Sequence, residues 1–184
     1  MKIGITGSLS SGKSSVASIL SKKKNLLFSA DRTVQSLYKS KTFRKKLCKK
    51  FKIKEFDLKK EIKKNLLSKK ISLKSLGKFI HPMVRVKMKK FYKKNKNKKI
   101  LFFEIPLLIE SKLMNFFDFI ILVVAPRKLR LKRYLKKGGN KDIFNLLDNG
   151  QMSARNKVKF CDYLIVNNKS KAKLRSKVGD IINL

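Results

Sequence analysis

Five short apolar segments alternate with stretches of helical periodicity along this chain of 184 residues. Such uninterrupted apolar runs are typical of strands that are covered on both faces. The segments are Ile3–Thr6, Leu26–Ser29, Ile100–Ile105, Phe119–Val124 and Tyr163–Val166. Apolar residues at helical spacing mark Ser14–Lys23 and Thr33–Phe51. Because strands and helices alternate, we predict an α/β fold with a five-stranded parallel sheet and right-handed crossovers.

A stretch of roughly 70 residues separates the second and third predicted strands, far more than one crossover helix needs. It contains two amphipathic segments, KEFDLKKEIKKNLL and ISLKSLGKFIHPMVRVKMKKF. We expect a helical insertion here, with a break at His81-Pro82 because proline lacks the amide N–H. No internal repeat and no Gly/Ser-rich linker marks a second domain.

The formal net charge of +38 at pH 7 attracts phosphate-bearing partners of every kind and selects none of them. The basic residues are 41 lysines and eight arginines, spread from Lys2 to Lys177. Specific recognition of phosphate or guanine favours arginine, whose planar fork binds two acceptors at once. We therefore expect a solvated lysine surface without a specific nucleic-acid partner.

The length of the apolar segments indicates whether the protein could span a membrane. None approaches the roughly 18 residues of a membrane span, and we find no signal peptide. Cys48 and Cys161 lack the spacing of a zinc site or a disulfide framework, so we expect two reduced thiols. These features predict a cytoplasmic protein without a membrane partner.

The stretch GSLSSGKS, Gly7–Ser14, matches the phosphate-binding pattern G-x-x-x-x-G-K-[ST]. It follows the first predicted strand and precedes an apolar-periodic helix, which is the context that the pattern requires. Glycines let several N–H groups converge on a phosphate, and the helix N-terminus adds a positive dipole. Lys13 would reach the β- and γ-phosphates, and the Ser14 hydroxyl would ligate Mg²⁺.

Two acids come at the carboxyl ends of predicted strands, the edge at which open parallel sheets bind ligands. Asp31 follows the second strand and is either the base that accepts a proton from an attacking hydroxyl or a cap for a helix beginning near Thr33. Glu104 lies in the third strand and is either a ligand on the metal side or a plain strand-end acid. It is also the next candidate for the base.

Seven segments together resemble the dephospho-coenzyme A kinase family over nearly the whole chain. In order, they are TGSLSSGKSSVA, SADRTVQSLY, GKFIHPMVR, EIPLLIE, DFIILVVAP, GQMS and CDYLIVNN. The resemblance implies a three-layer α/β/α P-loop NTPase fold with a helical acceptor-binding insertion and a lid. It also implies transfer of the γ-phosphoryl of ATP to the 3′-hydroxyl of dephospho-CoA, which gives coenzyme A and ADP in the final step of coenzyme A biosynthesis.

Carried over by position, the resemblance implies roles for particular residues. Asp31 becomes the catalytic base, with Lys13 and Arg133 as catalytic cations. The ATP-binding residues would be Ser10, Ser11, Gly12, Lys13, Ser14, Ser15 and Lys137. The acceptor-binding residues would be Asp31, His81, Arg85 and Glu110. For His81 a helix end before proline, and for Glu110 a structural role, stay open as alternatives.

The implied lid covers about 127–150 and departs from the family pattern. Arg130 stands where the family has a glutamine, Arg133 matches its first arginine, and Lys137 replaces its second. A lysine keeps the charge but loses the planar fork. The alternative for this basic segment is a solvated helix face. Ser8 and Ser10 replace family glycines, and we expect the loop to keep its shape if their φ angles are negative.

We expect one kinase domain with a core of about 1–32, 98–126 and 151–184, a helical acceptor region of about 33–97 and the lid. Two other functions remain open. A kinase of another nucleoside-like acceptor would share the phosphate loop and Asp31 but need not share HPMVR. A nucleic-acid-binding ATPase would explain the charge but not Asp31, and usually has an arginine-led or aromatic binding face.

Overall fold

The computed structural model describes residues 1–21 and 26–182, and a single parallel sheet forms the centre of this part of the chain. Its strands are β1 (Lys2–Thr6), β2 (Leu27–Ser29), β3 (Leu101–Glu104), β4 (Phe119–Val124) and β5 (Tyr163–Val166). They lie in the order β2-β3-β1-β4-β5, and every neighbouring pair is parallel. The strands predicted from apolar runs are confirmed to within one residue at each end.

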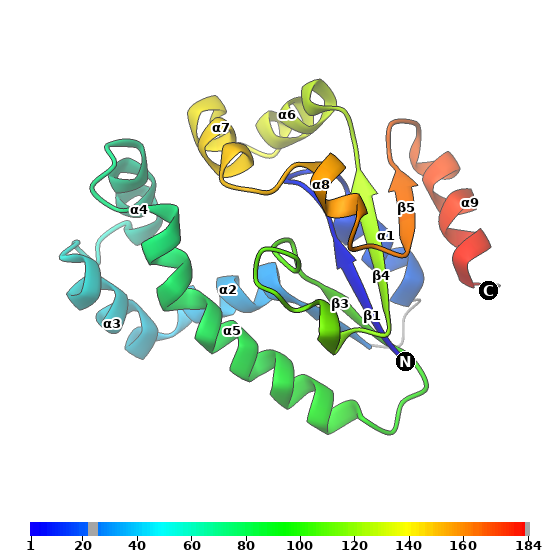
Figure 1. Cartoon of the computed structure of the whole chain (residues 1–184). Coiled ribbons are helices and arrows are strands. Elements are labelled where there is room, and N and C mark those ends of the chain that lie inside the picture. The colour runs from blue at the N-terminus through cyan, green and yellow to red at the C-terminus, as the bar shows by residue number, and fades with distance from the viewer. Residues whose placement is uncertain (22–25, 183–184) are drawn as a thin grey trace.

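Helices cover both faces of the sheet (Figure 1). They are α1 (Lys13–Ser21), α2 (Ala30–Lys39), α3 (Lys41–Phe51), α4 (Leu58–Leu67), α5 (Leu73–Asn95), the 3₁₀ turn η1 (Met114–Phe116), α6 (Arg127–Lys136), α7 (Lys141–Asn149), α8 (Ala154–Val158) and α9 (Lys171–Ile182). Helices α1 and α9 pack on one face. The second half of α5 and the segment after β3 pack on the other. The result is the predicted three-layer α/β/α arrangement.

Successive residues of β1 point to opposite faces of the sheet, and both faces are packed against apolar residues. Ile3 and Ile5 point into the core beneath α1 and α9, whereas Gly4 points to the opposite face. There a Cβ atom would lie 2.6 Å from Leu108 Cδ1. Only a residue without a side chain therefore lets the segment after β3 pack this closely on the central strand.

The insertion between β2 and β3 has an apolar core of its own. Its buried members come from α2 to α5 and the turn before α5, and they are Leu37, Phe43, Leu47, Leu58, Ile62, Leu66, Ile71 and Ile80. Leu146 of α7 packs against the same core. The helical insertion inferred from the long gap between strands is thus present, and it contacts the helix pair that follows β4.

The expected break at His81-Pro82 is wrong, because α5 runs through Pro82 without interruption. The cost of a proline inside a helix is offset by packing on both sides of it. Ile80 is buried in the core of the insertion, and Met88 is buried against the sheet. Tertiary contacts at both ends thus hold one continuous helix where local propensity favours two.

The stretch Thr33–Phe51 forms two helices rather than one. Helix α2 begins earlier than expected, because the Ser29 side chain caps it by accepting from the N–H of Arg32. Ser40 separates α2 from α3, and its hydroxyl accepts from the N–H of Phe43. The first crossover helix is confirmed as α1, and the last two residues of its predicted range, 22 and 23, lie outside the described residues.

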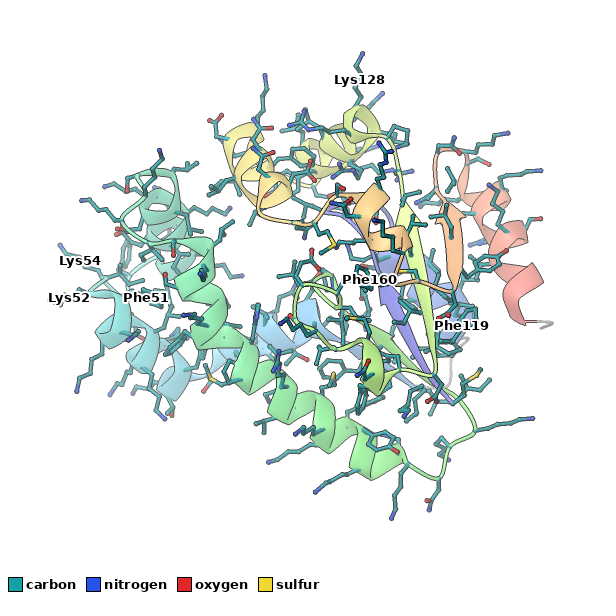
Figure 2. The ribbon with its side chains drawn as sticks, in the orientation of Figure 1. Phe51, Lys52, Lys54, Phe119, Lys128 and Phe160 are labelled. Atoms are coloured by element: carbon teal, nitrogen blue, oxygen red, sulfur yellow. The ribbon has the colours of Figure 1, made fainter. Side chains whose placement is uncertain are left out.

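Lysines project from the surface in several directions, and in Figure 2 Lys52 and Lys54 point away from the ribbon beside α3, whereas Lys128 does so at the top of the view, on α6. The scatter fits a solvated surface better than one binding face. Within residues 1–21 and 26–182, no helix has the length and apolar character needed to cross a membrane.

Replacing Pro82 by Ala should stabilise the protein by about 1–3 kcal/mol, because alanine restores the missing main-chain donor in the middle of α5. Urea unfolding followed by circular dichroism measures this change. The exposed Lys87→Ala variant in the same helix is the control, and its stability should stay within about 0.5 kcal/mol of the parent. An unchanged or lower midpoint for Pro82→Ala would mean that proline carries no cost here.

Candidate active site

The predicted phosphate loop connects β1 to α1, and both of its glycines are required by the backbone. Gly7 has φ +146° and Gly12 has φ +105°. A Cβ atom at Gly7 would lie 2.1 Å from Val123 O, and one at Gly12 would lie 2.0 Å from Asn167 Nδ2. The loop therefore sits tightly between the ends of β4 and β5, which fixes its position on the sheet.

Ser10 corrects one expectation about this loop. Its φ is +57°, in the left-handed region, whereas Ser8 has the expected negative φ. A left-handed serine costs roughly 1 kcal/mol. Hydrogen bonds to the preceding residue offset this cost, because Leu9 donates its N–H to Gln151 Oε1 at 3.0 Å and accepts from Arg130 at its carbonyl. The loop thus keeps its curved shape without glycine at this position.

The Lys13 side chain is buried and lies across the loop, where its ammonium donates to the carbonyl of Ser8 at 2.9 Å. Burial lowers the pKa of Lys13 to about 8, and the charges of Asp31 and Glu104 counteract part of that shift. The side chain is therefore still predominantly cationic at neutral pH. It lies between two carboxylates beside a loop that can bind phosphate.

Ser14 is the second residue of α1, and its hydroxyl donates to Glu104 Oε1 at 2.5 Å. Glu104 is almost completely buried at the carboxyl end of β3. It reaches the loop because β3 pairs with β1, with Glu104 opposite Ile5. The pairing of strands far apart in sequence thus brings together two oxygen-bearing groups that were separately predicted to lie on the metal side.

Asp31 is the second residue of α2, at the carboxyl end of β2. The alternative that it caps this helix is wrong, because Ser29 is the capping residue. Its carboxylate interacts electrostatically with Lys13. Burial raises the pKa of Asp31, the nearby Glu104 charge raises it further, and Lys13 lowers it. The carboxyl group therefore does not cap α2, and its burial near Lys13 and Glu104 favours the protonated form more than solvent would.

One cavity of about 1360 Å³ brings most of the predicted site residues together. Pockets for one drug-sized ligand usually measure roughly 300–1,000 Å³, so this cavity is larger than one such ligand needs. The predicted residues that line it are Ser10, Gly12, Lys13, Ser14, Ser15, Asp31, His81, Arg85, Glu110, Arg133 and Lys137. The remaining two do not line it. Ser11 is a buried residue of the loop itself, and Glu104 is a buried residue that accepts a hydrogen bond from Ser14.

The helical insertion supplies the wall that faces the phosphate loop. His81 does not end a helix, since α5 continues past it, and its imidazole lies over Gly77. Burial lowers the pKa of His81, and the charge of Arg85 lowers it further. Arg85 donates to the carbonyl of Ser111 at 2.8 Å, which holds its guanidinium at the cavity between α5 and the segment after β3.

Glu110 makes contacts that the sequence did not predict. Its Oε1 accepts from the N–H of Met152 at 3.0 Å and forms an ion pair with Lys157 Nζ at 3.0 Å. The Lys157 side chain is fully buried and also donates to the carbonyl of Pro106 at 3.2 Å. One lysine among so many gives no signal in the sequence. Its importance follows only from its burial next to a carboxylate.

The basic helix α6 lies against the phosphate loop. Arg133 donates to the carbonyl of Ser11 at 3.3 Å and to that of Asn167 at 3.1 Å. Asn167 in turn donates its side-chain amide to the carbonyl of Ser11 at 2.8 Å. The alternative that this basic segment is a solvated helix face is wrong for Arg130, because its side chain is buried. Asn167 and Gln151 were not singled out before, although both lie within the motifs CDYLIVNN and GQMS.

A parallel sheet with a phosphate loop after its first strand, a buried lysine in that loop and a carboxylate near it defines the class of P-loop nucleotide-binding proteins. Comparison with solved structures agrees at the level of the fold. A Thermus thermophilus protein superposes with a TM-score of 0.70 at 23% identity, covering 100% of this chain and 97% of that one. Shikimate kinase from Aquifex aeolicus gives 0.53 at 17% identity, with 100% and 96% covered.

Within this class, the chain belongs to the dephospho-CoA kinase family, whose model matches residues 1–173. The dephospho-CoA kinase of Rickettsia prowazekii is 32% identical over 166 residues, which cover 90% of this chain and 87% of the relative. That of Fusobacterium nucleatum is 29% identical over 184 residues, with 97% and 95% covered. The enzyme catalyses the ATP-dependent phosphorylation of dephospho-CoA, the last step of coenzyme A biosynthesis. The family resemblance noted in the sequence is confirmed.

Replacing Lys157 by Met should destabilise the protein by about 2–3 kcal/mol, because the Glu110 carboxylate would lose its cation inside the structure. Loss of one partner from a fully buried pair costs roughly 3–5 kcal/mol, and the partial exposure of Glu110 reduces that figure. Denaturant unfolding measures the effect. In the matched double variant Lys157→Met/Glu110→Gln the carboxylate is also gone, and part of the stability should return. Equal stability of Lys157→Met and the parent would contradict the role of this ion pair.

Proposed function

We propose that ATP occupies the phosphate-loop side of the cavity and dephospho-CoA the side formed by the helical insertion, with Asp31 between them. The observation that supports this arrangement is a single cavity lined both by Lys13 and Asp31 and by His81 and Arg85 of the insertion. In Figure 1, α4 and the start of α5 lie at the left of the view, whereas α6 and α7 lie at the top. A phosphoryl group can pass directly between two molecules that bind in the same cavity.

The donor phosphates would be held by main-chain N–H groups of the loop and by Lys13. We assign ATP binding to Ser10, Ser11, Gly12, Lys13, Ser14, Ser15 and Lys137. Lys137 is exposed at the end of α6 and lines the cavity, so its charge can approach a bound triphosphate. For Arg133 to act on the transferring phosphoryl group, as the sequence predicts, its guanidinium would first have to leave the carbonyls of Ser11 and Asn167.

Asp31 is the proposed base. Its carboxylate would accept the proton of the 3′-hydroxyl as the oxygen forms its bond to the γ-phosphorus of ATP, while the bond to the leaving ADP oxygen breaks. The raised pKa of Asp31 brings it closer to the operating pH, where a base is most effective. Lys13 would stabilise the charge that develops on the transferring group.

The oxygen donors at the loop fit a magnesium ion that accompanies the nucleotide. Ser14 and Glu104 lie together there, and Mg²⁺ is usually bound by one or two protein oxygens, water and substrate phosphates. Within residues 1–21 and 26–182 there is no cluster of three or more His, Cys, Asp or Glu side chains that could hold a metal by itself. Ser14 would be a ligand and Glu104 a second one, and the ion would neutralise phosphate charge.

The acceptor would lie against α5 and the segment after β3. Arg85 is positioned to bind the pyrophosphate of dephospho-CoA, because a guanidinium can contact two phosphate oxygens at once. His81 and Glu110 line the same region. Lys63, Lys74 and Lys78 add further positive charge to the cavity wall, which suits a polyanionic substrate.

Three further assignments belong to this proposal. The lid of about 127–150 closes over the donor, the acceptor region of about 33–97 binds dephospho-CoA, and the rest is the core.

The partners are small molecules, without a specific nucleic acid or a membrane, because the lysines project from separate parts of the surface (Figure 2). The enzyme would work in the cytoplasm, where ATP is available and the thiols Cys48 and Cys161 stay reduced.

A coupled assay of ADP release with a panel of acceptors tests the substrate assignment. Turnover should require dephospho-CoA and Mg²⁺, whereas AMP, CMP and adenosine should support little, because they do not reach both the base and the α5 wall. Chelation with EDTA should abolish activity, and added Mg²⁺ should restore it. AMP as the best acceptor would leave only the kinase class. Tight, sequence-selective nucleic-acid binding at physiological salt would instead support an ATPase acting on nucleic acid.

Asp31→Asn and Lys13→Ala should separate the base from the phosphate ligand. Asp31→Asn keeps size and hydrogen bonding but cannot accept a proton, so kcat should fall by about 10²- to 10⁴-fold with little change in the Kd of ATP. Lys13→Ala removes a cation that contacts the triphosphate before and during transfer, so affinity and turnover should both fall. Stopped-flow turnover and calorimetric ATP titration measure the two effects.

The pH profile gives this prediction a second readout. Because the carboxylate form is active, kcat/KM should fall as the pH drops through the pKa of Asp31, which lies above the ordinary 3.8. This acid limb should be lost in Asp31→Asn. Near-normal kcat in Asp31→Asn would exclude the carboxylate as the base, and Glu104 would then be tested by the same pair of measurements.

A further inference from the structure

The phosphate loop is held by side chains of α6 and of the segment just after α7. Arg130 of α6 donates through Nη1 to the carbonyl of Leu9 at 3.3 Å, and it does not line the cavity. Gln151, just after α7, accepts from the N–H of Leu9 at 3.0 Å. Both polar main-chain groups of one loop residue are therefore fixed by side chains from beyond β4.

We propose that Arg130, held in place by Asp148, is a positioning residue for the phosphate loop. It fixes the Leu9–Ser10 peptide so that the N–H of Ser10 points at the triphosphate. This inference rests on the proposed binding of ATP phosphates by the loop, and it adds a function for a residue that touches neither substrate.

The direction of the Ser10 N–H follows from peptide geometry. A trans peptide is planar, with its C=O and N–H pointing in opposite directions. The carbonyl of Leu9 points toward Arg130, behind the cavity wall, so the N–H of Ser10 points toward the cavity that Leu9 and Ser10 line. The left-handed φ of Ser10 is part of this orientation. Releasing the carbonyl would let the peptide rotate and would relieve the strained serine.

Asp148 keeps Arg130 available for this contact. Its two carboxylate oxygens pair with Nη1 and Nη2 of Arg130, the latter at 3.1 Å. Arg130 Nε also donates to the carbonyl of Ala125 at 3.1 Å, and its guanidinium carbon lies 5.7 Å from the centre of the Phe144 ring. A charge buried this deeply needs such partners. Because Asp148 is in α7, the position of that helix bears directly on the loop.

Arg127 provides a matched control from the same helix. It pairs with the same carboxylate at 3.4 Å and lies 5.5 Å from the same aromatic ring, but it bonds to Asn145 of α7 instead of the loop. Its side chain is 55% exposed, whereas that of Arg130 is 10% exposed. Replacing either arginine by Met keeps an unbranched apolar stem and removes one positive charge. Only the Arg130 replacement removes the contact with Leu9.

The test measures calorimetric Kd values of the full-length protein for Mg·ATP, inorganic tripolyphosphate and dephospho-CoA. Arg130→Met should weaken ATP and tripolyphosphate by about tenfold each, the effect of losing roughly one good hydrogen bond to a charged ligand. The Kd of dephospho-CoA should not change. Arg127→Met should leave all three values as in the parent. Asp148→Asn should weaken the phosphate ligands in the same direction, and the double variant with Arg130→Met should add little more.

The outcomes are distinct. Parent protein that binds neither ATP nor tripolyphosphate would overturn the proposed function together with this inference. A folded Arg130→Met variant with parental Kd values, or an equal loss in Arg127→Met, would overturn the inference alone. If Arg130→Met does not fold, Asp148→Asn decides. A shifted Kd with the Ser10 amide resonance moved in the nitrogen–proton NMR spectrum supports the role of Arg130, and parental values of both exclude it.

Discussion

The active site is arranged around one buried charge, the ammonium group of Lys13. Removing this group from water disfavours its charged form and lowers its pKa to about 8, even though two nearby carboxylates oppose that shift. The carbonyl of Ser8 and the fields of Asp31 and Glu104 keep it cationic at neutral pH. Each of these partners must hold its place for the charge to be tolerated. The loop, the end of β3 and the start of α2 are therefore constrained together, and this constraint positions the predicted base opposite the phosphate loop.

Acidic residues are scarce in this protein, and their distribution is informative. There are 11 of them against 49 basic residues, yet Asp31, Glu104, Glu110 and Asp148 all lie at or next to the cavity. Glu104 accepts from a hydroxyl, Glu110 and Asp148 pair with cations, and Asp31 interacts with the charge of Lys13. Most lysines, in contrast, extend into solvent, where ion pairing contributes little. The large net charge therefore describes the surface, whereas the few carboxylates organise the site.

Two arginines of α6 donate to carbonyls of the loop and so attach the α6–α7 segment to it. Arg130 contacts Leu9, and Arg133 contacts Ser11. Gln151 and Met152, which follow this segment, bond to the loop and to Glu110, respectively. Leu146 also packs against the helical insertion. The phosphate loop, the helical insertion and the α6–α7 segment are thus joined by direct contacts, so a change in one of them can reach the others.

The sequence by itself determined the strand positions and the phosphate loop, because both are local patterns. Five apolar runs predicted the sheet, and GSLSSGKS between a strand and a helix predicted the loop. The family resemblance supplied the proposed base and acceptor residues. Tertiary structure alone decided the rest. Pro82 stays helical because packing on either side outweighs a missing hydrogen bond. Ser10 keeps a left-handed φ because distant residues fix the loop. Lys157 and Arg130 are structurally important because each is buried and paired with a carboxylate. Such energies depend on neighbours from distant parts of the chain, which no local pattern contains.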